Sequence, residues 1–385
     1  MKKTNVLEII HGIHFGGAEK VVLQISTLSD RKKINIATVC LADGILFNKL
    51  KEENIDAHLI EMKSKYDLFV IPKIIKLVKE EKINVIHTHT GRTNFIGRIA
   101  AKLTGIKHIT TIHSPIILDV NDGVSPQKTN AFVEKVTAFL SDYFVCVSEE
   151  GKQRLVENNV NKNKVCTIYN GAQVAKKEIS EKEIIDFKKE FNIENDEYIV
   201  SMVASLRPRK GPEYFLKAIP LIKNEIKNVK FLIVGSAEFV ESRDYLAELK
   251  ELSKSVGILV DKELIFTGFR NDIDIILEAS DLIILPSIFG EGLPLTLLEA
   301  MAHKTAIITT DAEGNREVVK DGVNGFLVPP KDEKAIAEKT VKLLKDENLR
   351  NTFAENGFQI VNSKYTIENM IKGYEEIFER ISASS

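Results

Sequence analysis

Cysteine is scarce in this sequence, with only Cys40, Cys146 and Cys166 in a chain of 385 residues. Their separation matches no zinc-ligand pattern, and three thiols cannot form a closed set of disulfides, so a reducing compartment is the simplest interpretation. Long apolar runs are also absent. No stretch approaches the roughly 20 residues that cross a bilayer, and the first run, Val6–Ile10, is too short for a signal peptide. We therefore expect a cytoplasmic chain.

The glycine pattern of dinucleotide-binding domains is missing as well. Gly16 and Gly17 follow the first apolar run, but the spacing glycine-x-glycine-x-x-glycine does not occur. Asp43 lies in an expected loop beyond the second run, where it cannot serve as the acidic residue of that motif. A nicotinamide-dependent dehydrogenase is therefore disfavoured.

The length favours two domains, because a single hydrophobic core stops growing at about 250–300 residues. Apolar runs alternate with amphipathic segments in both halves, which predicts an α/β protein with two doubly wound, Rossmann-like parallel sheets. We place the domains at residues 1–172 and 173–365, with a linker and a surface helix over 173–196. The expected strands are 6–10, 34–41, 85–88, 109–113, 143–147 and 165–170 in the first domain, and 199–204, 231–234, 264–267, 282–285 and 306–309 in the second.

Charge divides unevenly between the two halves. Basic residues exceed acidic ones by about six up to Gly171, and acidic residues exceed basic ones by about eight after it. The basic half could contact an anionic membrane surface, or its lysines could simply keep the domain soluble. We expect no nucleic-acid partner. Candidates for membrane contact on one predicted helix are Arg92, Phe95, Ile96, Arg98, Ile99, Lys102, Leu103 and Lys107.

The segment Gly290–Ala302, GEGLPLTLLEAMA, follows an expected buried strand. Gly290 and Gly292 allow a tight turn, and Pro294 suits the first turn of a helix that should begin near Leu293. The first amides of such a helix, at the carboxyl end of a parallel strand, favour a phosphate group. The candidate phosphate-binding backbone is that of Gly292, Leu293, Pro294 and Leu295.

Two glutamates flank this expected phosphate site. Glu291 precedes the helix, and Glu299 lies among apolar residues on the order of 8 Å further along the chain's helical axis. A buried carboxylate needs a partner, so Glu299 either faces water or accepts hydrogen bonds from ligand hydroxyls. Arg207 and Lys210 follow another expected strand end. They could bind a diphosphate, or they could belong to a solvated basic loop.

The spacing of Glu291 and Glu299 resembles the donor-site signature of retaining glycosyltransferases of family 4 (glycosyl transferases group 1), which have the GT-B fold. The resemblance implies two Rossmann-like domains that face each other across a cleft, with a C-terminal helix, about 366–385, packed back on the first domain. Further segments resemble family motifs in the same order: HGIHFGGAE at 11–19, TIH at 111–113, VSE at 147–149, IYNG at 168–171, RPRKG at 207–211, FTGFR at 266–270 and DAEGNREV at 311–318.

The resemblance also implies roles for single residues. Glu291 would orient the donor sugar and Glu299 the ribose, while Arg207 and Lys210 would offset the charge of the leaving diphosphate. The donor loop reads GLPL where many members have GFG, which resembles a subset linked to surface polysaccharide assembly. The remaining implied contacts are the donor phosphates for Gly16 and Gly17, the base for Phe269 and Arg270, the donor sugar and its phosphate for His113, and the acceptor side for His89.

Three histidines, His87, His89 and His113, end expected strands of the first sheet. They could suggest zinc, but they form no i, i+4 pair on a helix, and no cysteine or carboxylate joins them. His87 is interpreted as a core histidine with satisfied hydrogen bonds. Asp272 and Asp274 have the spacing of a metal-binding pair, but they precede a helix that they would cap. We expect no cofactor and no divalent metal.

The expected enzyme is a retaining, metal-independent hexosyltransferase. It would move a sugar from a nucleotide-sugar, with a UDP-sugar favoured, to a glycan or lipid-linked acceptor in cell-surface polysaccharide or glycoconjugate synthesis, at the inner face of the membrane. The leaving phosphate would act as the base, because no carboxylate pair for a double displacement is evident. Two alternatives stay open: a sugar-nucleotide epimerase or phosphorylase of the same fold, and a non-catalytic glycan-binding homologue.

Overall fold

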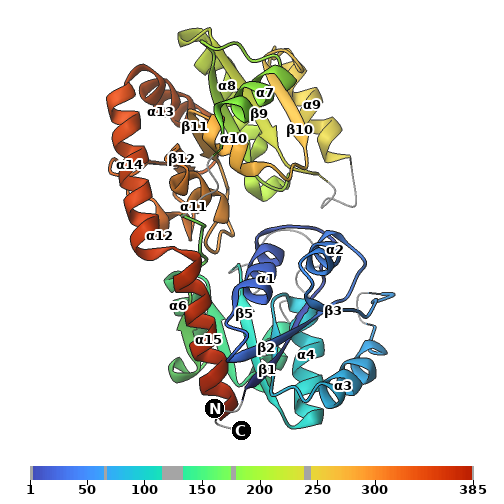
Figure 1. Ribbon diagram of the computed structural model, residues 1–385. Coiled ribbons are helices and arrows are strands. Elements are labelled where there is room, and N and C mark those ends of the chain that lie inside the picture. The colour runs from blue at the N-terminus through green and yellow to red at the C-terminus, as the bar shows by residue number, and fades with distance from the viewer. Residues whose placement is uncertain (1–2, 65–66, 115–132, 175–178, 238–243, 384–385) are drawn as a thin grey trace. The chain divides into compact units, whose positions relative to one another are not determined.

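The computed structural model describes residues 3–64, 67–114, 133–174, 179–237 and 244–383. The chain forms two compact units, one of Met1–Asn170 with Ile367–Ser385 and one of Gly171–Thr366 (Figure 1). Each unit contains a parallel sheet, as expected. None of the helices in the described ranges is both long enough and apolar enough to cross a membrane.

The sheet of the first unit has the strand order β3-β2-β1-β4-β5-β6-β7. Strands are added outward from β1 in both directions, so the order reverses between β1 and β4. In α/β sheets, ligands bind beyond the carboxyl ends of the strands at such a switch point. The strands are β1 (Thr4–Ile10), β2 (Ile34–Cys40), β3 (Asp56–Leu59), β4 (Val85–Thr88), β5 (Lys107–Ile112), β6 (Tyr143–Cys146) and β7 (Val165–Thr167).

The sheet of the second unit repeats this plan with the order β10-β9-β8-β11-β12-β13. Its switch point lies between β8 and β11, which pair in parallel. The strands are β8 (Tyr198–Val203), β9 (Val229–Val234), β10 (Leu264–Gly268), β11 (Leu282–Leu285), β12 (Ala306–Thr310) and β13 (Phe326–Val328).

Helices cover both faces of the first sheet. Side chains of α3 and α4 pack with Leu7 and Ile9 of β1, whereas side chains of α1 and α2 pack with Ile10. This division follows from the alternation of side chains along a strand, because successive residues point to opposite faces. The helices are α1 (Gly17–Leu28), α2 (Ile45–Glu52), α3 (Val70–Glu80), α4 (Gly91–Thr104) and α6 (Glu149–Glu157), with the short helices η2 (Ala138–Leu140) and η3 (Lys162–Lys164).

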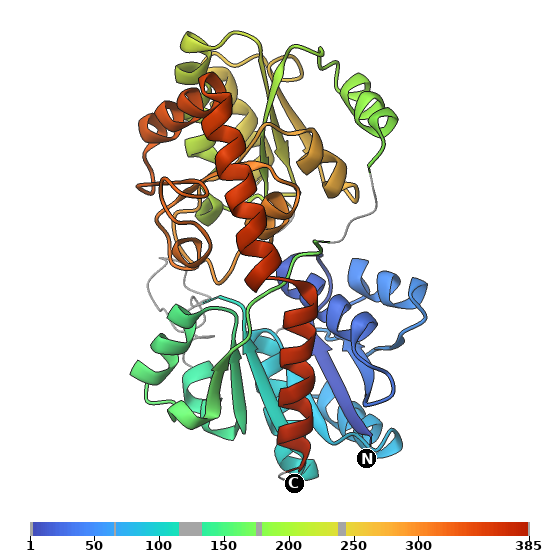
Figure 2. The same cartoon turned by 60° about the vertical axis from the view of Figure 1, so that its left-hand side comes forward.

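The last helix of the chain, α15 (Ile367–Ala383), belongs to the first unit, where it contacts α1, β1 and β4 (Figure 2). Glu375 Oε1 accepts a 2.6 Å hydrogen bond from the Asp30 N–H, which fixes the helix at its polar edge. Its large apolar residues recur at helical spacing and are all buried: Ile367, Met370, Ile371, Tyr374, Ile377, Phe378 and Ile381.

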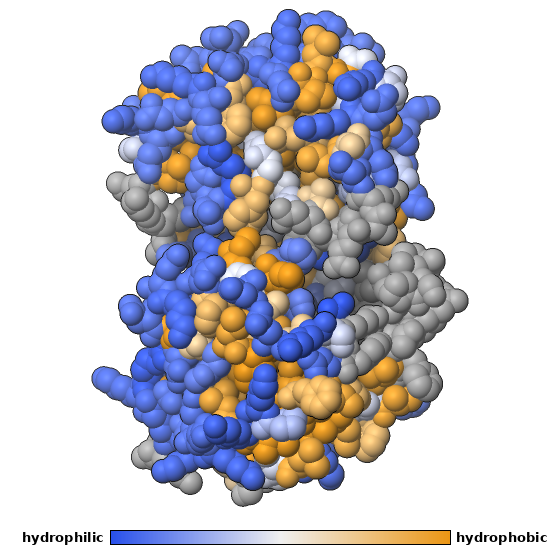
Figure 3. Space-filling view, turned by 90° about the vertical axis from the view of Figure 1, so that its right-hand side faces the viewer, coloured by the Kyte–Doolittle hydropathy of each residue, from blue (hydrophilic) through white to orange (hydrophobic). Residues whose placement is uncertain are grey.

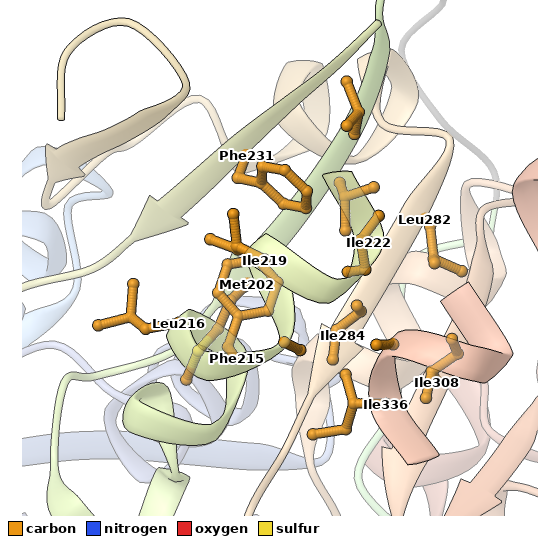
Figure 4. Packing of buried hydrophobic residues seen from close by; sticks show 14 of the residues in the cluster. Met202, Phe215, Leu216, Ile219, Ile222, Phe231, Leu282, Ile284, Ile308 and Ile336 are labelled. Atoms are coloured by element: carbon orange, nitrogen blue, oxygen red, sulfur yellow. The ribbon is translucent and has the colours of Figure 1, made fainter. Parts of the chain in front are cut away.

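The core of the second unit lies between its sheet and the helices α8 and α13 (Figure 4). Phe215, Ile219 and Ile222 of α8 are spaced four and three residues apart, so they form one fully buried stripe against the strands. The helices of this unit are α7 (Glu181–Glu190), η4 (Pro208–Lys210), α8 (Pro212–Glu225), α9 (Tyr245–Ser255), α10 (Ile273–Ala279), α11 (Leu295–Ala302), α12 (Asn315–Val318), α13 (Glu333–Lys345) and α14 (Glu347–Lys364).

Two strands were not predicted from the sequence, β3 and β13. Both are edge strands with a partner strand on one side only. β3 has four residues and alternates polar with apolar ones, and β13 is apolar but only three residues long, so neither has the longer apolar run of a central parallel strand. Arg98 and Ile96 are also misassigned as membrane contacts, because both side chains are buried inside the first unit.

Arg98 instead forms a buried ion pair with Glu134. Its Nε donates to Ser141 Oγ at 2.8 Å and its Nη1 donates to Thr137 Oγ1 at 2.9 Å, so the guanidinium joins α4 to the segment around η2. The side chains of Arg98 and Glu134 are 0% and 3% exposed. A pair this deeply buried costs much when one partner is lost, because the remaining charge keeps its desolvation penalty.

We predict that Arg98→Met lowers the free energy of unfolding by about 3–5 kcal/mol. The double variant Arg98→Met/Glu134→Leu should recover most of that loss, because it removes both charges from the interior. Urea unfolding of the three proteins measures the effect. Equal stability of wild type and Arg98→Met would contradict the role given to this pair.

Candidate functional site

The loops at the switch point of the second sheet are packed closely together. β8 ends at Val203, and η4 separates it from α8. Gly211 follows η4 with φ of +67°, and a Cβ at this position would lie 2.1 Å from the Pro286 carbonyl oxygen. Only glycine fits where the loop after β8 meets the loop after β11.

Lys210 and Glu291 form an ion pair between these two loops. Lys210 Nζ lies 2.6 Å from Oε1 and 2.9 Å from Oε2 of Glu291, and the Ser287 hydroxyl donates to Oε1. Arg209 adds a second cation, with Nη1 4.0 Å from Glu291 Oε1 and a 3.0 Å hydrogen bond to the Gly290 carbonyl oxygen. The Glu291 side chain is 4% exposed.

These contacts decide the charge of Glu291. Burial alone would raise the pKa of this carboxyl, but the Lys210 ammonium and the Arg209 guanidinium together hold the pKa below its ordinary value of 4.5. Burial in turn lowers the pKa of Lys210, against the opposing effect of Glu291. Glu291 is therefore an anion at neutral pH, with its compensating cations supplied by the loop after β8.

The backbone of the Glu291 loop is held by the segment that follows β12. The Gly290 N–H donates to Glu313 Oε2 at 2.7 Å, and the Gly314 N–H donates to the Glu291 carbonyl oxygen at 3.0 Å. A Cβ on Gly314 would lie 1.7 Å from the Gly292 carbonyl oxygen, so the close approach requires glycine. The segment after β12 therefore fixes the position of Glu291.

The helix after this loop, α11, begins at Leu295, two residues later than expected, because Pro294 is its N-cap with an extended ψ of 116°. The Thr296 hydroxyl donates to the Val203 carbonyl oxygen at 3.1 Å, which places the first turn of α11 beside the end of β8. Glu299 lies one turn further along the same helix and is half-buried.

Arg207 is the N-cap residue of η4 and is half-buried. Phe269 and Arg270 follow β10, which is separated from β8 by β9. The Phe269 side chain is 41% exposed, whereas the Arg270 guanidinium pairs with Asp272 at 2.6 Å and with Glu190. The partners of Arg270 are therefore Asp272 and Glu190, and neither belongs to the loops that carry Lys210 and Glu291.

In the first unit, the glycine turn after β1 caps α1. Gly16 is the N-cap residue and Gly17 the first residue of the helix, and the Gly16 N–H donates to Glu19 Oε2 at 3.1 Å. This contact gives Glu19 a structural role at the helix start, because a carboxylate there compensates an amide without an intrahelical partner.

The switch point of the first sheet holds a cluster of Glu8, His87, His89 and His113, here called the histidine cluster, of which the first three are buried and His113 is half-buried. Glu8 Oε1 lies 2.9 Å from His87 Nδ1, and Glu8 Oε2 lies 2.6 Å from His89 Nε2. His89 Nδ1 lies 2.9 Å from His113 Nε2. His87 is completely buried and its Nε2 lies 2.7 Å from Thr111 Oγ1, so both of its nitrogens are hydrogen-bonded.

Burial alone would raise the pKa of Glu8, but His87 and His89 lower it to about 2. Burial lowers the pKa of His89 to about 4, and it lowers the pKa of His113 well below its ordinary value of 6.5. At neutral pH, Glu8 is therefore ionised, and His89 and His113 are uncharged.

Glu8, His87 and His89 could in principle share a metal ion, since one ligand atom of each lies within 4.8 Å of the others. Their direct hydrogen bonds argue against it, because two ligands of one zinc ion stand roughly 3.3 Å apart at ordinary bond lengths. These three residues are bonded directly to one another instead. Asp272 and Asp274 have separate partners, Arg270 at 2.6 Å and His303 at 3.0 Å.

Sequence reasoning gave no individual role to several residues that contact the candidate site residues in the structure, although three of them lie inside the motif segments named above: Glu8, Thr111, Tyr374, Arg209, Ser287 and Glu313. Glu8 had a recognisable signal, because it is an acidic residue in the middle of the apolar run Val6–Ile10. A charge inside a buried strand requires a polar partner on a neighbouring strand.

Two doubly wound parallel sheets of this order form the GT-B fold, and comparison with known proteins identifies the family. The model for glycosyl transferases group 1 matches residues 183–360, and the model for glycosyltransferase family 4 matches residues 15–176. The chain belongs to glycosyltransferase family 4.

Among characterised relatives, the chain is 28% identical to UDP-Gal:alpha-D-GlcNAc-diphosphoundecaprenol alpha-1,3-galactosyltransferase of Escherichia coli, over 92% of this chain and 93% of the relative. It is 27% identical to the capsular polysaccharide biosynthesis glycosyltransferase CapM of Staphylococcus aureus, over 90% of each chain. The structure of HepE of Anabaena in complex with UDP and glucose superposes with a TM-score of 0.86, at 22% identity, over 98% of this chain and 100% of HepE.

We predict that Lys210→Met destabilises the second unit by about 1–3 kcal/mol at pH 7, because Glu291 stays buried without its main partner. The pKa of Glu291 should then rise. In wild type the lowered pKa contributes stability above the ordinary value of 4.5 that is lost as the pH falls through the folded value. The difference between wild type and variant should therefore be largest above about pH 5 and shrink below about pH 4.5. Urea midpoints from pH 4 to 8 measure it, and a difference that does not change with pH would contradict this account.

Proposed function

We propose that this chain is a retaining, metal-independent hexosyltransferase that moves a sugar from a nucleoside-diphosphate sugar to a hydroxyl of a glycan or lipid-linked acceptor. The observation that carries the proposal is the Lys210–Glu291 pair at the switch point of the second sheet, beside the first turn of α11. It combines a largely buried cation, a buried anion and helix amides at the position where α/β sheets bind ligands.

The cations suit the diphosphate. Lys210 and Arg209 already compensate Glu291, and Arg207 precedes them on η4. The amides around Gly292 and Leu295 precede or begin a helix whose dipole favours an anion. Together these groups would stabilise the negative charge that develops as the nucleoside diphosphate leaves.

The carboxylates suit the two sugars of the donor. Glu291 is fixed by Lys210 and Ser287, and it would accept hydrogen bonds from hydroxyls of the transferred sugar. Glu299, about 6 Å further along α11 from its first residue, would accept from the ribose hydroxyls. The proposal further assigns the base to Phe269 and Arg270, the phosphates to Gly16 and Gly17, the donor sugar to His113 and the acceptor side to His89.

Retention of configuration follows if the acceptor attacks from the face that the diphosphate leaves, with the departing phosphate as the base. A double displacement would need a free carboxylate as nucleophile, and Glu291 is already bound to Lys210 and Ser287. Metal independence rests on the charges supplied by the chain, since Lys210, Arg209 and Arg207 can offset a diphosphate without a divalent ion.

The relatives suggest the substrates. The Escherichia coli relative is described as using UDP-galactose and a diphosphoundecaprenol-linked acceptor, and HepE was solved with UDP. We therefore propose a UDP-hexose as the donor, and a lipid-linked glycan of cell-surface polysaccharide synthesis as the acceptor, with the protein in the cytoplasm at the inner face of the membrane.

We predict that wild type binds UDP more tightly than GDP or ADP in buffer with EDTA, as measured by calorimetric titration. Glu299→Ala should weaken UDP binding about ten- to a hundredfold, because it removes a charged hydrogen-bond acceptor. Glu355→Ala, which removes an exposed carboxylate of α14 in the same unit, should leave binding unchanged.

Unchanged binding by Glu299→Ala would contradict the ribose assignment, and loss of binding in EDTA with recovery in Mg²⁺ would contradict metal independence. An absence of binding to every nucleotide would favour the non-catalytic alternative. The anomeric proton coupling of the product, measured by NMR, separates retention from inversion, and release of a free sugar phosphate would instead indicate a phosphorylase.

We further propose that the α3–α4 side of the first unit contacts an anionic membrane. Phe69 at the start of α3, Leu103 near the end of α4 and Phe139 of η2 are 85%, 66% and 79% exposed. Figure 3 views this unit from the side that carries α3 and shows apolar side chains spread among hydrophilic ones. Exposed lysines of the same layer, Lys73, Lys76, Lys79 and Lys102, add the charge that anionic lipids attract.

We predict that wild type sediments with vesicles containing phosphatidylglycerol and much less with neutral vesicles, and that added salt weakens the binding. Phe69→Gln/Leu103→Gln should reduce binding at least tenfold, because it removes the two apolar anchors. Leu259→Gln, which replaces an exposed leucine of the second unit, is the matched control. Equal binding of the double variant and the control would contradict this surface.

A further inference from the structure

The histidine cluster of the first unit arises from strand register. β1 pairs with β4 so that Glu8 lies opposite His87, and β4 pairs with β5. His89 follows β4 and His113 follows β5, so both lie at the carboxyl edge of the sheet. The cluster therefore extends from the buried centre of β1 to the edge where ligands bind in sheets of this kind.

The proton positions on the rings of this cluster follow from the charge of Glu8. An ionised carboxylate can only accept hydrogen bonds. Glu8 Oε1 and Oε2 must therefore receive protons from the rings that face them, so His87 carries a proton on Nδ1 and His89 carries one on Nε2. Both contacts are completely buried, and water cannot substitute for either partner.

The proton position on His89 in turn determines the proton position on His113. An uncharged imidazole has one N–H and one lone pair. Since His89 uses its proton on Nε2 towards Glu8, its Nδ1 holds the lone pair and must accept from His113 Nε2, 2.9 Å away. His113 is uncharged as well, because burial lowers its pKa well below 6.5. Its Nδ1 therefore has no proton.

We propose that Glu8 is a positioning residue that acts through His89 to fix His113 as its Nε2–H tautomer, so that His113 Nδ1 can accept a hydrogen bond but cannot donate one. The inference rests on the proposed function, in which His113 binds the donor sugar. It deepens that function, because the ring can then bind only a group that donates, such as a sugar hydroxyl.

This tautomer of His113 distinguishes the sugar of the donor from its diphosphate. A phosphate oxygen at neutral pH is an acceptor, and it would face the lone pair of His113 Nδ1 rather than a proton. His113 would therefore contact a hydroxyl and not the phosphate, which narrows the role that the family resemblance implies. The diphosphate is left to the cations of the second unit, Lys210, Arg209 and Arg207.

The other arm of the cluster offers a matched control. His87 Nε2 lies 2.7 Å from Thr111 Oγ1, which lies 3.4 Å from the Tyr374 hydroxyl of α15. Thr111→Val breaks this arm but leaves the contacts among Glu8, His89 and His113 in place. It should therefore leave the His113 tautomer unchanged, although it alters the same buried region.

The test is ¹⁵N NMR of the full chain labelled at histidine, without substrate, with signals assigned from single histidine variants. In wild type we expect a protonated Nδ1 at His87 and a protonated Nε2 at His89 and His113. Glu8→Leu should lose the single tautomer at His113 and lower kcat/KM about tenfold or more, which corresponds to the loss of one hydrogen bond of ~1.4 kcal/mol. Thr111→Val should retain both the single tautomer at His113 and the wild-type kcat/KM.

Glu8→Gln provides a second variant if Glu8→Leu does not fold. A carboxamide accepts with one atom and donates with the other, so one of the two facing rings must move its proton. Either His87 changes alone, or His89 and His113 change together. A change at His89 without a change at His113 overturns the proposal, as does a wild-type His113 protonated on Nδ1.

Zinc gives one more outcome that would overturn the inference. If added Zn²⁺ shifts His87 Nδ1 and His89 Nε2 together and EDTA reverses the shift, the cluster is a metal site. Failure of the proposed function remains distinguishable, because the tautomers are measured without donor or acceptor. If the expected tautomers are found but the chain has no transferase activity, the hydrogen-bond network stands and only the proposed function is wrong.

Discussion

A carboxylate withdrawn from water must be compensated by hydrogen-bond donors, and this constraint shapes both units of the protein. Each sheet has one deeply buried carboxylate at its switch point, Glu8 in the first and Glu291 in the second. Neither could remain there alone, because an uncompensated charge in the interior costs several kcal/mol. Each carboxylate therefore requires its compensating residues, which are His87 and His89 in the first unit and Lys210 in the second.

The two solutions differ in their chemistry. Glu291 is compensated by cations, so the second site contains charged side chains and suits an anionic group such as a diphosphate. Glu8 is compensated by imidazole N–H groups, and the edge of its cluster is uncharged at neutral pH. A network of this kind suits hydroxyl groups, whose recognition depends on which atom carries the proton. One family-4 glycosyltransferase chain thus contains a charged site and a neutral site built on the same topology.

Sequence patterns predicted central features of the fold and failed at particular places for physical reasons. The central strand β11 is a continuous apolar run and was recognised, whereas the edge strand β3 is interrupted by polar residues and β13 has only three residues. Arg98 was placed on the surface because helix periodicity cannot reveal a buried guanidinium whose partner, Glu134, comes from another segment. The start of α11 moved from Leu293 to Leu295 because Pro294 is extended in the loop.

The sequence by itself determined the two-sheet architecture and the family, because these depend on local periodicity and on the order and spacing of motifs along the chain. It also proposed Lys210, Glu291 and Glu299 as donor-site residues, which stays a prediction. Only the tertiary structure decided which partner each charge has. Ser287 and Glu313 hold the Glu291 loop. Glu8 contacts His87 and His89, which lie about 80 residues further along the chain. Strand register sets such contacts, and register is fixed by packing of the whole sheet rather than by any local pattern.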